Sequence, residues 1–131
     1  MVEARPFRQV NVFSADPLGG NPLAVVHDAE GLSEAQMGAL ARWTKLSETT
    51  FLLAPSEPGL DYHVRIFTPG GKPRKAGLAV QQCGAGLAES AYVAAQGAAL
   101  QRSGRVYLRK QGDQAWAGGD VIEVVRGEIR I

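Results

Sequence analysis

The segment Leu46-Ser47-Glu48-Thr49-Thr50-Phe51 places a carboxylate between hydroxyl side chains. The hydroxyls can hold the Glu48 side chain in one orientation, and we expect Trp43 and Phe51 as its apolar neighbours. Such surroundings suit a carboxylate that moves a proton to or from a substrate. A glutamate in an exposed turn, capping backbone N–H groups, would show the same spacing. Both interpretations are open at this point.

A second candidate precedes an alanine-rich segment. Gly84-Ala85-Gly86 could bind an anion through the N–H groups of a helix start, and the same position would favour the thiolate of Cys83. The dinucleotide pattern G-x-G-x-x-G is incomplete, because Glu89 stands at its last glycine. Tight packing of the glycines and burial of a small cysteine would explain the same residues, so this candidate also has two interpretations.

The histidines form no constellation with other residues. Neither His27 nor His63 has a partner at ligand spacing, and we expect both at the surface or at the rim of a fold. The sequence has no serine–histidine–acid, Walker or metal-ligand pattern. It therefore predicts no metal site.

The composition is that of a globular domain. A chain of 131 residues suits one core, and 45% hydrophobic with 21% charged residues lies far from the composition of disordered chains. A net charge of +1 gives no general attraction to nucleic acid or to an anionic membrane. With one cysteine and no apolar leader or spanning run, we expect a cytoplasmic protein.

Hydrophobic periodicity predicts the elements of the first half of the chain. Ser33 and Gln36 have the spacing of a capping box, which predicts a helix that begins after Ser33 and ends near Trp43 to Lys45. Four residues share its inward face: Met37, Leu40, Ala41 and Thr44. Strands are expected at Phe7–Phe13, Leu23–His27, the segment 46–55 and Tyr62–Phe67.

In the second half, alanine-rich spacing predicts a central helix over Ala85–Gln96. The strands expected after it are 105–110, 114–117, 120–125 and 128–131, with a turn at Arg126-Gly127. We also expect both tryptophans, Trp43 and Trp116, in the core or at its edge. Together these elements predict an α+β fold in which antiparallel strands wrap one helix.

Four motifs occur in a specific order. They are Arg5-Pro6-Phe7-Arg8-Gln9-Val10-Asn11-Val12-Phe13, Gly20-Asn21-Pro22-Leu23-Ala24-Val25-Val26, Leu46-Ser47-Glu48-Thr49-Thr50-Phe51 and Val64-Arg65-Ile66-Phe67-Thr68-Pro69. This order closely resembles the amino-terminal region of the phenazine-biosynthesis PhzF-like isomerases. The tail, from Gly104-Arg105-Val106 through Trp116 and Gly118-Gly119 to Gly127-Glu128-Ile129, resembles the carboxy terminus of that family.

The resemblance implies a diaminopimelate-epimerase-like fold, in which a mainly antiparallel, barrel-like sheet wraps a central helix. We predict one domain over residues 1–131. Residues 1–69 form the family's amino-terminal region, 70–103 a divergent loop with the central helix, and 104–131 the carboxy-terminal strands. Two-domain members are about twice this length, so the chain resembles a member with a large internal deletion.

The resemblance also implies an isomerase that moves a proton on a small carboxylate substrate, without metal or organic cofactor. Glu48 would be the catalytic acid/base, and Asn21, Ser47 and Gly77 would bind substrate. A half-size chain would expose the cleft side that a second domain normally covers, which predicts a homodimer whose partner completes the cleft.

Two departures from the family pattern support an alternative. The family's A-G-H-P-T motif corresponds here to Ala76-Gly77-Leu78-Ala79-Val80, so leucine and alanine replace the histidine and the proline. The second-domain D-P-x-T-G-S motif has no match in the sequence. The alternative is an inactive fold remnant that acts as a small-molecule binding or interaction domain.

Overall fold

The chain divides into two compact units in a computed structural model, which describes residues 2–55, 58–59, 62–73, 91–96, 104–111 and 114–131. The first unit comprises Met1–Val10, Pro22–Arg74 and Glu123–Ile131. The second comprises Asn11–Asn21 and Lys75–Ile122. The assignment of residues 1–131 to one domain stays a prediction.

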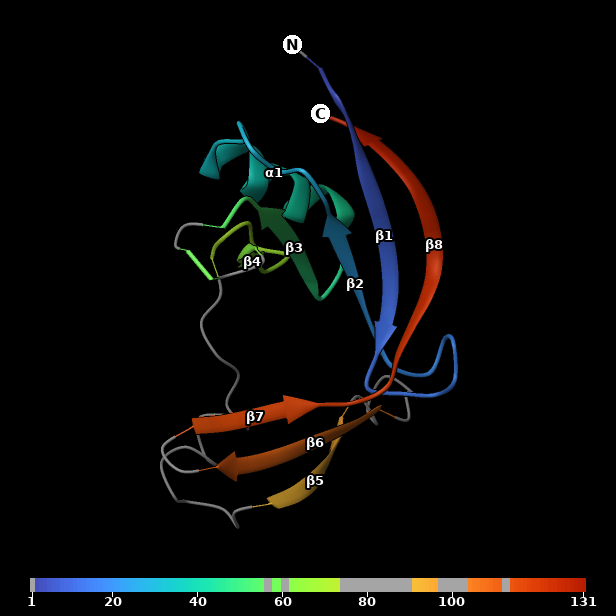
Figure 1. Cartoon of the computed structure of the whole chain (residues 1–131). Coiled ribbons are helices and arrows are strands. Elements are labelled where there is room, and N and C mark those ends of the chain that lie inside the picture. Colours follow the sequence, from blue (N-terminus) through green and yellow to red (C-terminus); the bar gives the residue numbers. More distant parts are fainter. Residues whose placement is uncertain (1, 56–57, 60–61, 74–90, 97–103, 112–113) are drawn as a thin grey trace. The chain divides into compact units, whose positions relative to one another are not determined.

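A five-stranded sheet with strand order β4-β3-β2-β1-β8 is the framework of the first unit (Figure 1). Its strands are β1 (Ala4–Val12), β2 (Asn21–Val26), β3 (Glu48–Leu53), β4 (His63–Phe67) and β8 (Val121–Arg130). Glu3 and Ile131 exchange two backbone hydrogen bonds of 3.0 Å, the pattern of an antiparallel pair. These bonds join the start of β1 to the end of β8.

One pair of strands in this sheet is parallel. β2 and β3 run in the same direction, with Leu23 opposite Glu48 and Val26 opposite Phe51. Helix α1 (Glu34–Thr44) connects them and returns the chain to the same end of the sheet, which a parallel pair requires. The α+β class is confirmed. The parallel pair β2–β3 is an exception within the mainly antiparallel sheet that was predicted, and the wrapping of a central helix and closure into a barrel stay predictions.

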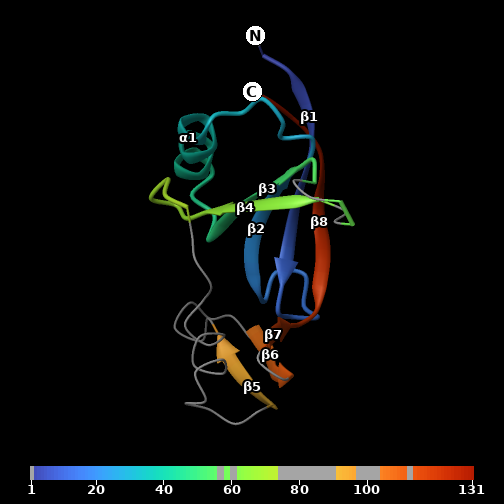
Figure 2. The ribbon, with the colours of Figure 1, turned by 60° about the vertical axis from the view of Figure 1, so that its left-hand side comes forward.

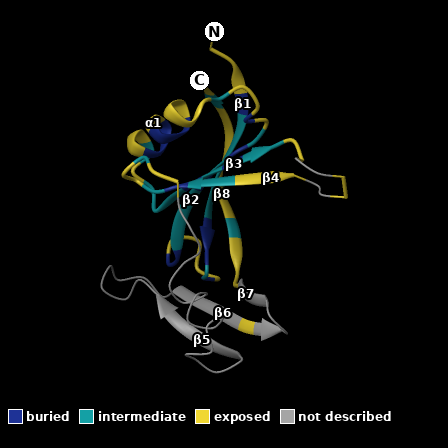
Figure 3. Cartoon of the chain, turned by 90° about the vertical axis from the view of Figure 1, so that its left-hand side faces the viewer, coloured by how far each residue is buried: buried dark blue, intermediate teal, exposed yellow. Residues whose placement is uncertain are grey.

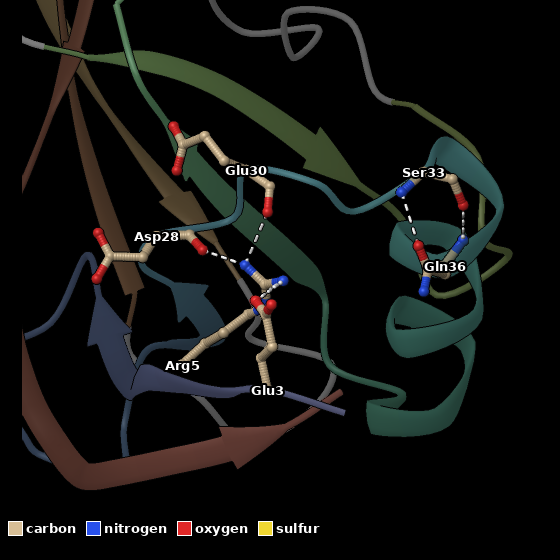
Figure 4. Close-up of polar contacts among 6 residues, drawn as sticks. All are labelled: Glu3, Arg5, Asp28, Glu30, Ser33 and Gln36. Carbon is tan, nitrogen blue, oxygen red and sulfur yellow. Dashed lines mark hydrogen bonds and ion pairs between the residues drawn. The ribbon is translucent and has the colours of Figure 1, made fainter. Parts of the chain in front are cut away.

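Helix α1 begins and ends where the sequence predicts. The backbone N–H of Gln36 donates to Ser33 Oγ at 3.1 Å, and the N–H of Ser33 donates to Gln36 Oε1 at 2.8 Å (Figure 4). This reciprocal pair is the predicted capping box. At the other end Lys45 takes a left-handed conformation with φ 56°, and its N–H donates to the carbonyl oxygen of Ala41.

The core of the first unit lies between α1 and the sheet (Figure 3). The rings of Phe51 and Phe67 meet edge to face, with centroids 5.6 Å apart. The other buried members are Val26, Ala29, Met37, Leu40 and Ala41. Trp43 is not among them, because it lies on the flank of the inward-facing stripe of α1 and is 77% exposed. Its predicted core position was wrong, and the Trp116 side chain lies outside the described residues.

The central helix predicted over Ala85–Gln96 was wrong for its last six residues. Ala91–Gln96 forms strand β5, which pairs antiparallel with β6 (Gly104–Gln111), and β6 pairs with β7 (Gln114–Gly118). Helix propensity differs by only a few tenths of a kcal/mol per residue, so a ladder of backbone bonds to a neighbouring strand outweighs it. Residues 85–90 lie outside the described part of the chain.

Two predicted boundaries were also wrong. β8 runs without a break through Arg126-Gly127, where a turn was expected, and curves along its length (Figure 1). Gly127 has no positive φ, and no atom lies within 4 Å of its missing Cβ, so it continues the strand. β1 ends at Val12 rather than Phe13, because Phe13 has φ 66° and leaves the extended conformation.

Candidate functional site

Glu48 is the first residue of β3, and its side chain is half-buried. It lies opposite Leu23 in the register of the parallel pair, so its backbone position is fixed by β2. Ser47, just before the strand, is half-buried as well. The structure therefore places these two predicted site residues side by side at the start of a central strand.

The side chain of Glu48 faces away from helix α1. Thr49 and Phe51 are fully buried on the α1 side, and the hydroxyls of Thr49 and Thr44 lie 3.2 Å apart. Successive side chains of a strand point to opposite faces of the sheet, so Glu48 and Thr50 point to the other face. Figure 2 shows α1 to one side of the sheet.

The part of the sheet surface that β2, β3 and β4 form around Glu48, here called the Glu48 face, is mostly apolar. Strand register places Val25 beside Thr50, and Thr50 and Leu52 beside the β4 residues Ile66 and Val64. The set that shares this face is Leu23, Val25, Glu48, Thr50, Leu52, Val64 and Ile66. Within this set Glu48 is the one ionisable side chain. A half-buried carboxylate on an apolar surface can accept a proton from a substrate and return it.

The apolar neighbours expected for Glu48 were wrong. Phe51 lies on the opposite face of the sheet, and Trp43 is an exposed residue of α1. The spacing of the sequence suggested both, but strand alternation separates Phe51 from Glu48. Leu23, Val25 and Ile66 supply the apolar surroundings instead.

Asn21 opens β2 after a loop that is held by Asn11. The Asn11 amide nitrogen donates to the carbonyl oxygen of Asp16 at 3.1 Å, and its oxygen accepts from the N–H of Gly20 at 2.9 Å. Gly20 has no room for a side chain, because a Cβ would lie 2.7 Å from the Asn11 amide nitrogen. The sequence analysis did not predict that Asn11 holds this loop. The available signal was a polar side chain within the alternating pattern of the first strand.

The third predicted binding residue, Gly77, lies outside the described residues, as do Cys83 and Gly84-Ala85-Gly86. His27 is half-buried and His63 exposed, as expected for rim and surface positions. Within the described ranges, no three His, Cys, Asp or Glu side chains gather as a metal site requires. The described part of the chain contains no helix that is long and apolar enough to span a bilayer.

Arg5 holds the loop between β2 and α1 in place (Figure 4). Its guanidinium donates to the carbonyl oxygens of Asp28 and Glu30 and forms an ion pair of 2.9 Å with Glu3. The residue is 6% exposed, and its Nε has no hydrogen-bond partner. Arg5 therefore ties β1 to the segment that leads into α1, which is a structural reason for arginine in the first sequence motif.

Comparison with known proteins identifies the family. A family model described as phenazine biosynthesis-like protein matches residues 10–80. Antisense-enhancing sequence 1 of Schizosaccharomyces pombe is 51% identical over 63 residues, which are 48% of this chain and 21% of that protein. The trans-2,3-dihydro-3-hydroxyanthranilate isomerase of Pseudomonas aeruginosa is 47% identical over 60 residues, 46% of this chain and 21% of that enzyme.

A solved PhzF-family structure from Enterococcus faecalis is 28% identical with a TM-score of 0.49, over 84% of this chain and 42% of that chain. The matched part of the present chain spans about a fifth of the length of the two curated relatives. The family match stops at residue 80, and the carboxy-terminal motifs lie beyond it, which is consistent with the internal deletion. Since the family model spans more than half of the sequence, the chain belongs to the phenazine biosynthesis-like protein family, which includes isomerases.

Proposed function

We propose that this protein is an isomerase that moves a proton between two carbon atoms of a small carboxylate substrate, with Glu48 as the acid/base. The observation that carries the proposal is the half-buried Glu48 on an apolar sheet face, inside the segment that matches the family. The substrate class follows the isomerase relatives, which are named for trans-2,3-dihydro-3-hydroxyanthranilate.

In the proposed reaction the Glu48 carboxylate takes a proton from one carbon, and the bonding electrons shift along the substrate. The carboxylic acid formed at Glu48 then delivers a proton to another carbon. No atom is gained or lost, and no oxidation occurs. Ser47, next to Glu48, and Asn21, at the start of β2, are the proposed substrate-binding residues, together with Gly77.

A second protomer is proposed to complete the cleft. The Glu48 face is half-exposed, and Val64 on it is 38% exposed. An apolar sheet face of this kind is typical of surfaces that another chain covers. Size-exclusion chromatography with light scattering should give twice the mass of the chain. A monomer at micromolar concentration would rule out the shared cleft.

The second candidate function is an inactive fold remnant that binds a small molecule or a partner. It is favoured by Leu78 and Ala79, which stand where the family motif has histidine and proline. This candidate predicts that Glu48 has no reaction to catalyse.

Incubation with trans-2,3-dihydro-3-hydroxyanthranilate and related dihydroaromatic acids in D₂O distinguishes the two candidates. Glu48 exchanges its proton with solvent between the two transfers, so an active isomerase should place deuterium on a substrate carbon. Mass spectrometry of the recovered compounds measures the incorporation. If none of the tested acids takes up more deuterium than it does in a protein-free sample, the result would favour the inactive fold remnant.

A further inference from the structure

Two arginines lie on the same side of the sheet as Glu48. Phe7 of β1 packs against the core on the α1 side, so its neighbour Arg8 points to the other side, where Glu48 lies. The Glu123 carboxylate lies 3.4 Å from Arg8 Nε and 2.5 Å from Arg126 Nε. Because they share this carboxylate, all three side chains lie on this side. Two positive charges and one negative charge leave the cluster positively charged.

Arg8 is held in place by its own contacts. Its Nη1 donates to the carbonyl oxygen of Phe7 at 2.9 Å, and its Nε faces Glu123. The Arg8 side chain is 25% exposed, whereas that of Arg126 is 70% exposed. Partial burial strengthens an ion pair because less water screens it. Within this cluster Arg8 is therefore the arginine better suited to bind an anionic group.

Strand β2 lies between Arg8 and Glu48. β1 and β2 run in opposite directions (Figure 1), and the N–H of His27 donates to the carbonyl oxygen of Pro6 at 2.9 Å. Counting two residues from this bond along each strand places Val25 opposite Arg8. Val25 belongs to the Glu48 face, so an apolar side chain lies between the arginine and the carboxylate.

The separation of Arg8 and Glu48 suits a small ring. Val25 lies opposite Thr50, two residues after Glu48 on β3. Neighbouring strands are about 4.8 Å apart and rise about 3.3 Å per residue. The Cα atoms of Arg8 and Glu48 are therefore about 10 Å apart across the strands and about 7 Å apart along them. Both side chains point to the same side of the sheet and shorten this gap.

We propose that Arg8 binds the carboxylate of the substrate whose proton Glu48 transfers, so that the substrate ring lies over Val25. This inference rests on the proposed function, which supplies the carboxylate substrate. Three observations carry it: the guanidinium is held but partly exposed, its cluster has an excess of positive charge, and an apolar residue lies between Arg8 and Glu48. Arg8 would thus select acids and orient the ring toward Glu48.

Binding of anthranilate tests this assignment without turnover. Anthranilate is a stable aromatic acid related to the compound for which the isomerase relatives are named, and 2-aminobenzamide is its neutral analogue. Each is titrated into nitrogen-15-labelled protein, and the shifts of the amide signals give the affinity and the site. We expect anthranilate to bind about five- to tenfold more tightly and to shift Val25 and Thr50 more than α1. Equal affinities, shifts confined to α1 or no saturable binding would overturn the proposal.

Arg8→Gln should weaken anthranilate binding about five- to tenfold, to the level of 2-aminobenzamide. Its affinity for 2-aminobenzamide should be unchanged, which also shows that the variant is folded. Arg8→Lys should give an intermediate affinity for anthranilate, because an ammonium group keeps the charge but not the planar fork of the guanidinium.

Arg65→Gln is the matched control. Arg65 is 31% exposed and forms an ion pair of 3.0 Å with Glu34, so it resembles Arg8 in burial and in pairing. It lies on the α1 side of the sheet, over the ring of the core residue Phe67. Its substitution removes the same charge and should leave anthranilate binding unchanged. Equal losses in Arg8→Gln and Arg65→Gln would show a general effect of net charge and would overturn the assignment.

Failure of this inference and failure of the proposed function give different results. If the protein places deuterium on a substrate, Arg8→Gln should raise KM for that substrate and leave kcat nearly unchanged, because the carboxylate is bound equally before and during proton transfer. Deuterium exchange with an unchanged KM would overturn the role of Arg8 alone. Anthranilate binding that depends on Arg8, without exchange on any tested acid, would leave the carboxylate site standing and contradict the isomerase.

Discussion

A methyl group placed on Gly38 would lie 2.5 Å from the carbonyl oxygen of Gly71, so helix α1 touches the turn after β4 backbone to backbone. Gly38 is buried in the middle of α1, and Gly71 has φ 79°, a conformation that favours glycine. Contact at this distance sets how closely α1 packs on the β4 end of the sheet.

Gly38→Ala should therefore destabilise the protein, although alanine is the better helix former by about 1 kcal/mol. The methyl group must displace backbone rather than a flexible side chain, at a cost of about 1–3 kcal/mol. We expect a net loss of up to about 2 kcal/mol in the free energy of denaturant unfolding, measured by circular dichroism. Gly127→Ala is the control, since nothing lies within 4 Å of its missing Cβ. Its effect should stay within about 0.5 kcal/mol. A more stable Gly38→Ala protein would contradict the close packing.

Ser33→Ala should lower the free energy of unfolding by about 0.5–2 kcal/mol, because the N–H of Gln36 loses the Ser33 hydroxyl as its acceptor. Gln36→Ala removes the reciprocal bond to the N–H of Ser33. Because the two bonds form one capping box, the double variant should lose less than the sum of the single losses. Thermal unfolding measures all three variants, and an unchanged midpoint for Ser33→Ala would show that the cap contributes nothing.

Arg126→Gln should raise the pKa of Glu123. In the folded chain Arg126 Nε donates to the Glu123 carboxylate at 2.5 Å, and this bond holds the pKa of Glu123 below its ordinary value. The same bond raises the pKa of Arg126. Arg8, 3.4 Å from the other oxygen, acts only through its charge, so Arg8→Gln should raise the pKa of Glu123 less.

The direction of the shift also fixes the pH dependence. A lowered pKa in the folded state stabilises the fold above the ordinary pKa of the carboxyl group, and this contribution fades as the pH falls through the folded-state value. Arg126→Gln should reduce this acid-dependent contribution of Glu123, and the part due to the charge of Arg8 should remain. Carbon-13 NMR of the carboxyl group across acidic pH measures the pKa in each variant. Equal pKa values in wild type and Arg126→Gln would contradict the assigned cause.

Local signals in the sequence predicted helix α1 well. Ser33 and Gln36 carry the cap within four residues, and the inward-facing side chains repeat at helical spacing, so no distant contact is needed to recognise them. Ala91–Gln96 failed for the opposite reason. Its strand conformation depends on pairing with Gly104–Gln111, and a partner in another segment leaves no mark on the local pattern.

The candidate site was predicted only in part for the same reason. The motif around Glu48 located the residue at the start of a strand, but the face on which its side chain lies depends on the register with β2. The contact between Gly38 and Gly71 likewise joins residues far apart in the chain. Such features follow from tertiary packing, which a single sequence does not display.

The central claim is that Glu48 transfers a proton, and the rate of deuterium incorporation in D₂O tests it most directly. Wild type is compared with Glu48→Gln, which keeps the size of the side chain and removes the base, and with Glu48→Asp, which keeps a carboxylate on a shorter stem. Circular dichroism confirms that each variant is folded. We expect Glu48→Gln to lose about 10²–10⁴-fold in rate and Glu48→Asp to retain part of it. Deuterium incorporation by Glu48→Gln at the wild-type rate would contradict the claim.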